Sequence, residues 1–256
     1  MTGRRPIDVP TRETVEFLAA HLTHGASLLE IGCGHGEVAR LLGDGGFRVV
    51  AIDADPEAVA RARELGVDAR LAAWPEYSGP GVDAIAFTRS LHHIGPLDAA
   101  LERVQALLQP RGMLLIEDFA FDTADTATID WFVTMLRTER AAALLQPVDH
   151  QFVTQLLTAA DPHVAWRRAG AHDIHDIGAM RAAVSRHFTE PQVEAVPYLY
   201  RYLVPVLDET TAAAEFVASI LQAERAAITS GQIAAIGRRI VAQNQPLKNS
   251  RITPAS

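Results

Sequence analysis

Residues 27–37 read Ser-Leu-Leu-Glu-Ile-Gly-Cys-Gly-His-Gly-Glu, a short apolar run followed by three closely spaced glycines. An apolar run of this length that ends in turn residues is typical of a buried strand. Glycine lets the backbone turn sharply and approach a ligand without interference from a Cβ atom. The segment therefore predicts a strand, Ser27–Ile31, that leads into a ligand-binding loop and then into a helix.

The spacing of these glycines separates two kinds of ligand. Loops that bind dinucleotides follow the pattern G-x-G-x-x-G around a pyrophosphate. Here the third glycine comes one residue early, at Gly36, and Glu37 stands where the dinucleotide pattern has glycine. A carboxylate at that point would repel a pyrophosphate. Acidic flanks at Glu30 and Glu37 suit a ligand that lacks phosphate and carries positive charge.

Strand and helix patterns alternate from the N-terminus to residue 120. We expect strands at residues 27–31, 47–52, 67–71, 82–87 and 113–116, and helices at about residues 11–22, 38–42, 55–65 and 96–108. No obvious hairpin interrupts them. This alternation is typical of a parallel sheet with helices on both faces.

The rhythm changes after Asp118. Helices are expected at residues 126–145, shortly after His150, and at residues 177–188 and 210–228; strands are expected at residues 193–206 and 236–243. We interpret residues 1–256 as a single domain in which residues 118–175 form a mainly helical insertion. This insertion would cover the carboxyl edge of the sheet, where open α/β sheets bind ligands. Residues 244–256 are expected to be a tail.

Composition narrows the class of protein. The 256 residues are 48% hydrophobic and 21% charged, which fits a globular domain with a sizeable core. The formal net charge of −8 argues against a nucleic-acid partner, which usually requires a basic face. The single cysteine excludes an intrachain disulfide, and no stretch approaches the roughly 18 apolar residues of a membrane span. A cytoplasmic location without membrane contact is expected.

The glycine loop and the segments after it resemble class I S-adenosylmethionine-dependent methyltransferases. Residues 30–36 match their first motif, Asp53 closes the second strand about 20 residues further on, and Leu91-His92-His93 follows the fourth strand. The resemblance implies a doubly wound, Rossmann-like, seven-stranded sheet that is mostly parallel with an antiparallel last strand. It also implies S-adenosylmethionine as cofactor and S-adenosylhomocysteine as product.

The same resemblance implies a cofactor site. Its expected residues are Glu30, Gly32, Cys33, Gly34, Gly36, Asp53, Ala54, Ala73, Trp74, Thr88 and Arg89. Asp53 would accept hydrogen bonds from the ribose hydroxyls. Many relatives have an acid after the third strand that binds adenine, but this chain has Ala72 and Ala73 there. Adenine is then expected to contact backbone groups near Ala73 and Trp74, although Trp74 is equally compatible with a plain core position.

Two histidines after the fourth strand are the candidate catalytic residues. His93, with its neighbour His92, is expected either to act as a general base or to position the acceptor. The alternative is that the pair only packs and closes the turn, because alignment alone can promote methyl transfer. Asp118 is expected to bind a polar acceptor. We expect no metal, since Glu117 and Asp118 have no convincing third ligand, and the run His172–Asp176 is more typical of a helix start.

The acceptor is expected to be a small molecule. Tyr198, Tyr200 and Arg201 would line its pocket, with residues 198, 200 and 202 on one face of a strand; cross-strand packing is the alternative. The chain lacks the Asn/Asp-Pro-Pro-aromatic motif of base-amine methylation and the Pro-Cys of cytosine methylation. The sequence leaves open a monomer or a homodimer. It also leaves open a cofactor-binding scaffold without turnover and an enzyme that uses the cofactor for another reaction.

Overall fold

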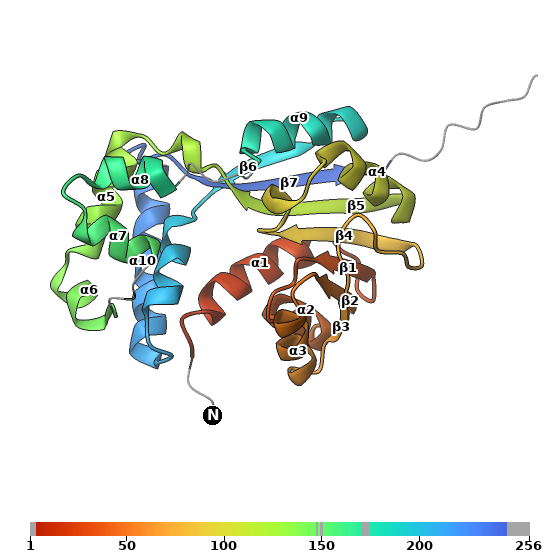
Figure 1. Ribbon diagram of the computed structural model, residues 1–256, viewed down its shortest axis with the longest axis horizontal. Coiled ribbons are helices and arrows are strands. Elements are labelled where there is room, and N and C mark those ends of the chain that lie inside the picture. Colours follow the sequence, from red (N-terminus) through yellow and green to blue (C-terminus); the bar gives the residue numbers. More distant parts are fainter. Residues whose placement is uncertain (1–3, 147, 149–150, 170–174, 245–256) are drawn as a thin grey trace, which may run out of the picture.

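The computed structural model describes residues 4–146, 148, 151–169 and 175–244, and these build a seven-stranded sheet covered by helices (Figure 1). In sheet order the strands are β3 (Asp68–Leu71), β2 (Arg48–Asp53), β1 (Ser27–Ile31), β4 (Val82–Thr88), β5 (Leu108–Phe119), β7 (Gly237–Gln243) and β6 (Gln192–Val196). Strand β7 is antiparallel to both neighbours, and the pairs from β3 to β5 are parallel. The predicted Rossmann-like sheet with an antiparallel last strand is confirmed.

Helices cover both faces of this sheet. Helices α1 (Asp8–Ala20), α2 (Glu37–Asp44) and α3 (Pro56–Glu64) pack on one face, and α4 (Leu97–Leu107) and α9 (Ile177–His187) on the other (Figure 1). Helix α3 begins as the sequence predicts, because the carboxylate of Asp55 accepts the N–H of Glu57 and Pro56 occupies the first turn.

The alternation of side chains along β5 sorts the polar residues at the carboxyl edge. Leu115 packs toward α1 and α2, whereas Leu114 and Ile116 pack toward α4 and α9. Because successive side chains of a strand point to opposite faces, Glu117 lies on the α1 face and Asp118 on the α9 face. These adjacent carboxylates therefore meet different partners.

A second hydrophobic core lies beside the sheet. Its elements are α5 (Thr126–Leu136), α6 (Glu139–Leu144), α7 (Phe152–Thr158), α8 (Pro162–Ala169), the 3₁₀ helix η3 (Leu199–Val206) and α10 (Thr211–Thr229), which we call the helical lobe (Figure 1). The helix expected at residues 126–145 is wrong as one element. It is interrupted at Thr138, whose hydroxyl accepts the N–H of Ala141 and so caps α6.

The strand expected at residues 193–206 is wrong beyond Val196. Pro197 has no N–H to donate to a neighbouring strand. The carboxylate of Glu224 on α10 accepts the backbone N–H groups of residues 198, 199 and 200 at 2.7, 2.9 and 3.1 Å. A buried side chain thus takes the place of a partner strand, and the chain continues as η3.

The predicted insertion at residues 118–175 contains α5 to α8, and η3 and α10 from later in the chain complete the same core. Of the expected tail, Asn244 alone is among the described residues, and its side-chain amide donates to the carbonyls of Leu108 and Gln109. No helix within the described ranges is long and apolar enough to cross a lipid bilayer.

Candidate cofactor and acceptor site

The glycine loop joins β1 to α2 and is held by close packing. Gly36 precedes α2 with φ +86°, and a Cβ atom there would lie 2.7 Å from Cβ of Ala62 on α3. Gly34 has φ +54°, but a Cβ atom there would meet nothing within 4 Å. Gly36 is therefore needed for packing against α3, whereas Gly34 leaves open space for a ligand.

Asp53 ends β2 opposite this loop. One carboxylate oxygen accepts the N–H of Gly34 at 2.9 Å and the other accepts the N–H of Asp55 at 3.0 Å. Each carboxylate oxygen has further lone pairs. The side chain is thus fixed by the backbone of both turns and can still accept hydrogen bonds from a ligand.

A cavity of about 460 Å³ lies over these turns. It is lined by Ile31, Gly32, Gly34, Ile52, Asp53, Ala54, Ala72, Ala73, Trp74, Arg89, Ser90, His93, Ile94 and Gly95. Eight residues predicted from the sequence meet there: Gly32, Gly34, Asp53, Ala54, Ala73, Trp74, Arg89 and His93. The other residues predicted for cofactor binding or catalysis are not part of its lining: Glu30, Cys33, Gly36, Thr88 and His92.

Trp74 lines the cavity and also belongs to the hydrophobic core. Its ring lines the cavity, but its indole N–H donates to the carbonyl of Ala100 at 3.1 Å and its edge meets Phe87. It is therefore a core residue with one side turned to the ligand space.

Two residues predicted for the cofactor site, Glu30 and Cys33, are buried and do not line the cavity. Glu30 is buried, accepts a hydrogen bond from the Thr88 hydroxyl at 2.7 Å, and burial raises its pKa to about 7. Cys33 packs among Ala39 and Val59, and burial raises the pKa of its thiol to about 12. Glu30 supports the loop from below, and Cys33 is a packing residue.

His92 and Asp118 form a buried pair. The imidazole Nδ1 lies 2.8 Å from Oδ1 of Asp118, and the N–H of Phe119 donates to the same oxygen at 3.0 Å. Because a carboxylate accepts and does not donate, Nδ1 carries the hydrogen and the lone pair of the neutral ring is on Nε2. The ring of His92 also contacts those of His93 and Phe119, with centroids 4.1 and 4.8 Å apart.

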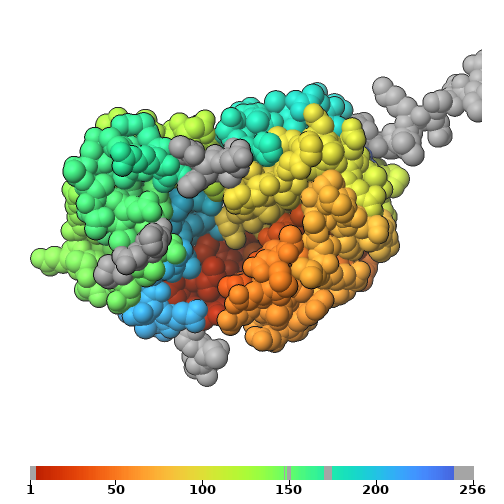
Figure 2. All heavy atoms as spheres, viewed as in Figure 1, coloured from red at the N-terminus to blue at the C-terminus, as the bar shows by residue number. Residues whose placement is uncertain are grey.

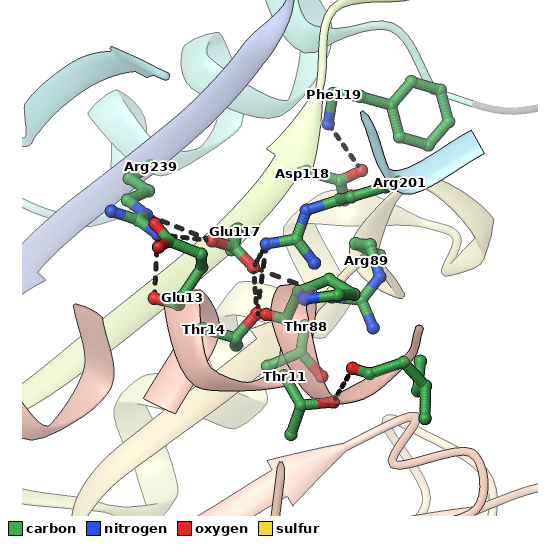
Figure 3. Close-up of polar contacts among 12 residues, drawn as sticks. Thr11, Glu13, Thr14, Thr88, Arg89, Glu117, Asp118, Phe119, Arg201 and Arg239 are labelled. Carbon is green, nitrogen blue, oxygen red and sulfur yellow. Dashed lines mark hydrogen bonds and ion pairs between the residues drawn. The ribbon is translucent and has the colours of Figure 1, made fainter. Parts of the chain in front are cut away.

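Glu117 is surrounded by arginines (Figure 3). Arg201 lies 2.8 Å, Arg239 3.0 Å and Arg89 3.6 Å from its carboxylate, and the Thr14 hydroxyl donates to it. Burial alone would raise the pKa of Glu117, but these cations outweigh burial and lower it. Arg201 is therefore engaged in this cluster, and the prediction that it lines the acceptor pocket finds no support in its contacts.

The tyrosines at residues 198, 200 and 202, predicted to share one face of a strand, lie at or within η3 and point to different places. The rings of Tyr198 and Tyr202 lie 5.4 Å apart and point toward Phe119 and Phe121. Tyr200 instead lines a separate cavity beside Glu13 and Arg225. The expectation that residues 198, 200 and 202 share one face is wrong.

The histidine–aspartate run at residues 172–176 is described only in part, since residues 170–174 lie outside the described ranges. The backbone N–H of His175 donates to the carbonyl of His92 at 2.8 Å. Asp176 caps α9 by accepting the N–H of Ala179 at 2.7 Å. Its end is therefore a helix start, as the sequence suggested.

Comparison with known proteins identifies the family to which the chain belongs. Residues 5–175 match the model of a methyltransferase domain family. The chain belongs to the S-adenosylmethionine-dependent methyltransferases. It is 31% identical over 190 residues to a ubiquinone biosynthesis O-methyltransferase from Xylella fastidiosa, a match that covers 70% of this chain and 74% of the relative.

Solved structures of methyltransferases share the fold. A putative sarcosine dimethylglycine methyltransferase from Galdieria sulphuraria aligns with a TM-score of 0.53 at 15% identity, over 91% of this chain and 86% of the other. A geranyl diphosphate C-methyltransferase from Streptomyces coelicolor aligns with a TM-score of 0.52 at 17% identity, over 91% and 80%. At such identities the likeness extends to the architecture alone.

The cavity of this methyltransferase fits its cofactor, S-adenosylmethionine. Gly34 gives a wall without a side chain, Asp53 an oriented carboxylate, and Trp74 an apolar ring. Arg89 and His93 are the basic side chains that line the cavity in the described part of the chain. That is little positive charge for a dinucleotide pyrophosphate and suits an adenosyl ligand that carries one carboxylate.

Sequence reasoning missed the aromatic side chains of the helical lobe and the partners of Glu117. Phe121, Phe152 and Trp166 gather around Tyr202, although they come from three different elements. Thr14 and Arg239 reach Glu117 from opposite ends of the chain. Arg239 stands next to Glu117 in the register of β5 and β7, but only the strand order reveals that neighbour.

Proposed function

We propose that the chain transfers a methyl group from S-adenosylmethionine to a small-molecule acceptor, with His92 as general base. The observation that carries this proposal is the continuity of the site. The cavity over Gly34 and Asp53 extends to His93, whose ring contacts the His92–Asp118 pair.

The residues of the cavity would hold the cofactor in three parts. Asp53 would bind the ribose hydroxyls, and Trp74 and Ala73 would contact the adenine. Arg89, whose partly exposed side chain lines the cavity while its Nη1 lies 3.6 Å from Glu117, would bind the amino-acid carboxylate. When bound, the cofactor supplies an activated methyl group on a sulfonium.

The residues beyond the cavity would handle the acceptor. His92 would take the acceptor proton on Nε2, while Asp118 holds the ring in the required tautomer and stabilises the imidazolium. His93, which contacts His92 and lines the cavity, would align the acceptor between the base and the cofactor. The helical lobe would exclude water, since it faces the sheet edge across a hollow whose floor is formed by residues near the N-terminus (Figure 2).

Two measurements test the proposal. Isothermal titration should show one S-adenosylhomocysteine bound per chain, and a small-molecule screen should find an acceptor that causes S-adenosylhomocysteine release. If the chain binds S-adenosylhomocysteine but no acceptor leads to its release, the chain would be a cofactor-binding scaffold without turnover. If the cofactor is consumed without a methylated product, the chain would use it for a different reaction.

A matched pair of variants tests the base. His92→Ala should lower turnover by about 10²-fold or more, as expected for loss of a general base, with unchanged affinity for S-adenosylhomocysteine. His93→Ala should weaken that affinity, because His93 lines the cofactor cavity. Equal turnover of wild type and His92→Ala across pH would contradict the base assignment.

A cytoplasmic location and a monomeric or homodimeric state without a nucleic-acid partner stay predictions from the sequence.

A further inference from the structure

Six aromatic side chains form a continuous surface next to His92, which we call the aromatic shelf. They are Phe119, Phe121, Phe152, Trp166, Tyr198 and Tyr202. Neighbouring ring centroids lie 4.6 to 5.4 Å apart along the run from Phe119 through Tyr198, Tyr202, Phe152 and Trp166 to Phe121. Elements from four parts of the chain therefore converge on this surface.

The shelf is not a closed core. Phe119, Phe121, Phe152 and Tyr202 are only partly buried, unlike Phe132 and Phe216 deeper in the helical lobe, which are 0% and 2% exposed. Figure 2 shows the hollow between the helical lobe and the sheet edge. The partial burial of these four rings thus leaves apolar surface accessible, and contiguous exposed apolar surface is typical of ligand-binding sites.

Two buried polar atoms at the shelf lack partners among the described residues. One is the Tyr202 hydroxyl and the other is Oδ2 of Asp118. Burial raises the pKa of Tyr202 well above its ordinary value, so the hydroxyl is protonated and can donate. A buried tyrosine hydroxyl usually finds a hydrogen-bond partner, and an acceptor molecule on the shelf would provide one.

The charge next to Tyr198 disfavours cationic ligands. The guanidinium of Arg201 lies 5.6 Å from the ring centroid of Tyr198 and covers that face. Burial raises the pKa of Tyr198, and Arg89 and Arg201 oppose that rise more strongly than Asp118 and Glu117 add to it. Positive charge therefore predominates at this ring and opposes a protonated amine there. At Tyr202 the neighbouring charges are those of Glu224 and Asp118, which raise its pKa further and keep the hydroxyl a hydrogen-bond donor.

We propose that the aromatic shelf binds an acceptor with a hydroxyl group on an aromatic ring, and that Tyr202 donates a hydrogen bond to that oxygen. The inference rests on the proposed function. A phenolic hydroxyl is protonated at neutral pH and requires a base. The acceptor oxygen gives its proton to Nε2 of His92 and forms the new C–O bond as the C–S bond of the donor breaks, with that electron pair left on sulfur.

The test uses 4-nitrophenol as a coloured probe of the full-length chain saturated with S-adenosylhomocysteine. One probe should bind per chain, and its absorption should shift toward that of the phenolate. Tyr202→Phe should weaken probe binding about fivefold, the value of one hydrogen bond of about 1 kcal/mol. Tyr200→Phe, on the other side of the same 3₁₀ helix, should leave probe binding unchanged.

Thermal unfolding separates this role from a structural one. Tyr202→Phe removes a hydroxyl that has no partner among the described residues, so the melting temperature should stay the same or rise. Unchanged probe affinity in Tyr202→Phe would overturn the inference, as would tighter binding of benzylamine than of 4-nitrophenol. If 4-nitrophenol fails to bind while S-adenosylhomocysteine binds, the inference fails and the proposed function stands. If S-adenosylhomocysteine itself fails to bind, the proposed function fails.

Discussion

Glu30 at the end of β1 and Glu117 at the end of β5 are equally buried, each 1% exposed, but their surroundings differ. Glu30 lies under the cofactor loop with one hydroxyl donor, and its pKa is raised to about 7. Glu117 lies where the sheet meets the helical lobe, and three arginines lower its pKa. Glu30 thus lies among neutral hydrogen-bond partners that leave its buried carboxyl easy to protonate, whereas Glu117 on the lobe side is held charged by buried ion pairs.

The largest effect is expected for Glu117→Ala. Removal of this carboxylate leaves the buried Arg201 and the partly buried Arg239 without their counterion, which should cost about 3–5 kcal/mol of unfolding free energy. Urea denaturation measures this loss. Asp68→Ala, which breaks an exposed pair with Arg70, is the control and should cost less than about 1 kcal/mol. If both variants lost the same unfolding free energy, the ion pairs of Glu117 would contribute no more than an exposed surface pair.

The next effect concerns pH and Glu30. Its pKa is higher in the folded chain than in the unfolded chain, so the folded state binds more protons and stability falls as pH rises from about 4.5 to about 7. Glu30→Gln keeps a carbonyl acceptor for Thr88 and removes this titration. Over that range the variant should lose about 3 kcal/mol less unfolding free energy than the wild type. If the unfolding free energies of wild type and Glu30→Gln changed equally with pH, the buried position assigned to Glu30 would be contradicted.

Glu117 titrates with the opposite sign. Its lowered pKa contributes stability that is present at neutral pH and is lost as the pH falls below the usual carboxyl range. Glu30 therefore lowers stability as the pH rises toward 7, and Glu117 lowers it as the pH falls below the carboxyl range. The pH dependence of Glu30→Gln and of Glu117→Ala separates the two contributions.

A smaller effect is expected for Asp53→Ala. Loss of the ribose contacts should weaken S-adenosylhomocysteine binding about 30-fold, or about 2 kcal/mol. Asp55→Ala removes the cap of α3 two residues away and should lower stability by about 1 kcal/mol with unchanged affinity. Titration calorimetry on both variants distinguishes the ribose contact from general loosening of the turn.

The sequence predicted the parts of the site that depend on neighbours along the chain. Asp53 ends a strand, and Gly34 and His93 lie within five residues of the end of one, and parallel strands bring their carboxyl ends to one edge. The alternation of apolar runs and helices predicted the five parallel strands, whereas the antiparallel last strand followed from the family resemblance. These elements are local, so their signals are present in the sequence.

The remaining parts depend on which segments meet in space. The pairing of His92 with Asp118 and of Glu117 with Arg239 requires the order of β4, β5 and β7. The strand predicted through Tyr200 failed because Glu224, on a distant helix, accepts the N–H groups of residues 198–200. Strand propensity does not reveal such a tertiary hydrogen bond.

A crystal structure of the chain with S-adenosylhomocysteine would show directly whether the cavity over the glycine loop holds the cofactor. We expect an adenosyl ligand over Gly32 and Gly34, with both ribose hydroxyls on the carboxylate of Asp53 and the sulfur facing His93. A vacant cavity in crystals soaked at saturating ligand, or a ligand whose ribose avoids Asp53, would contradict it.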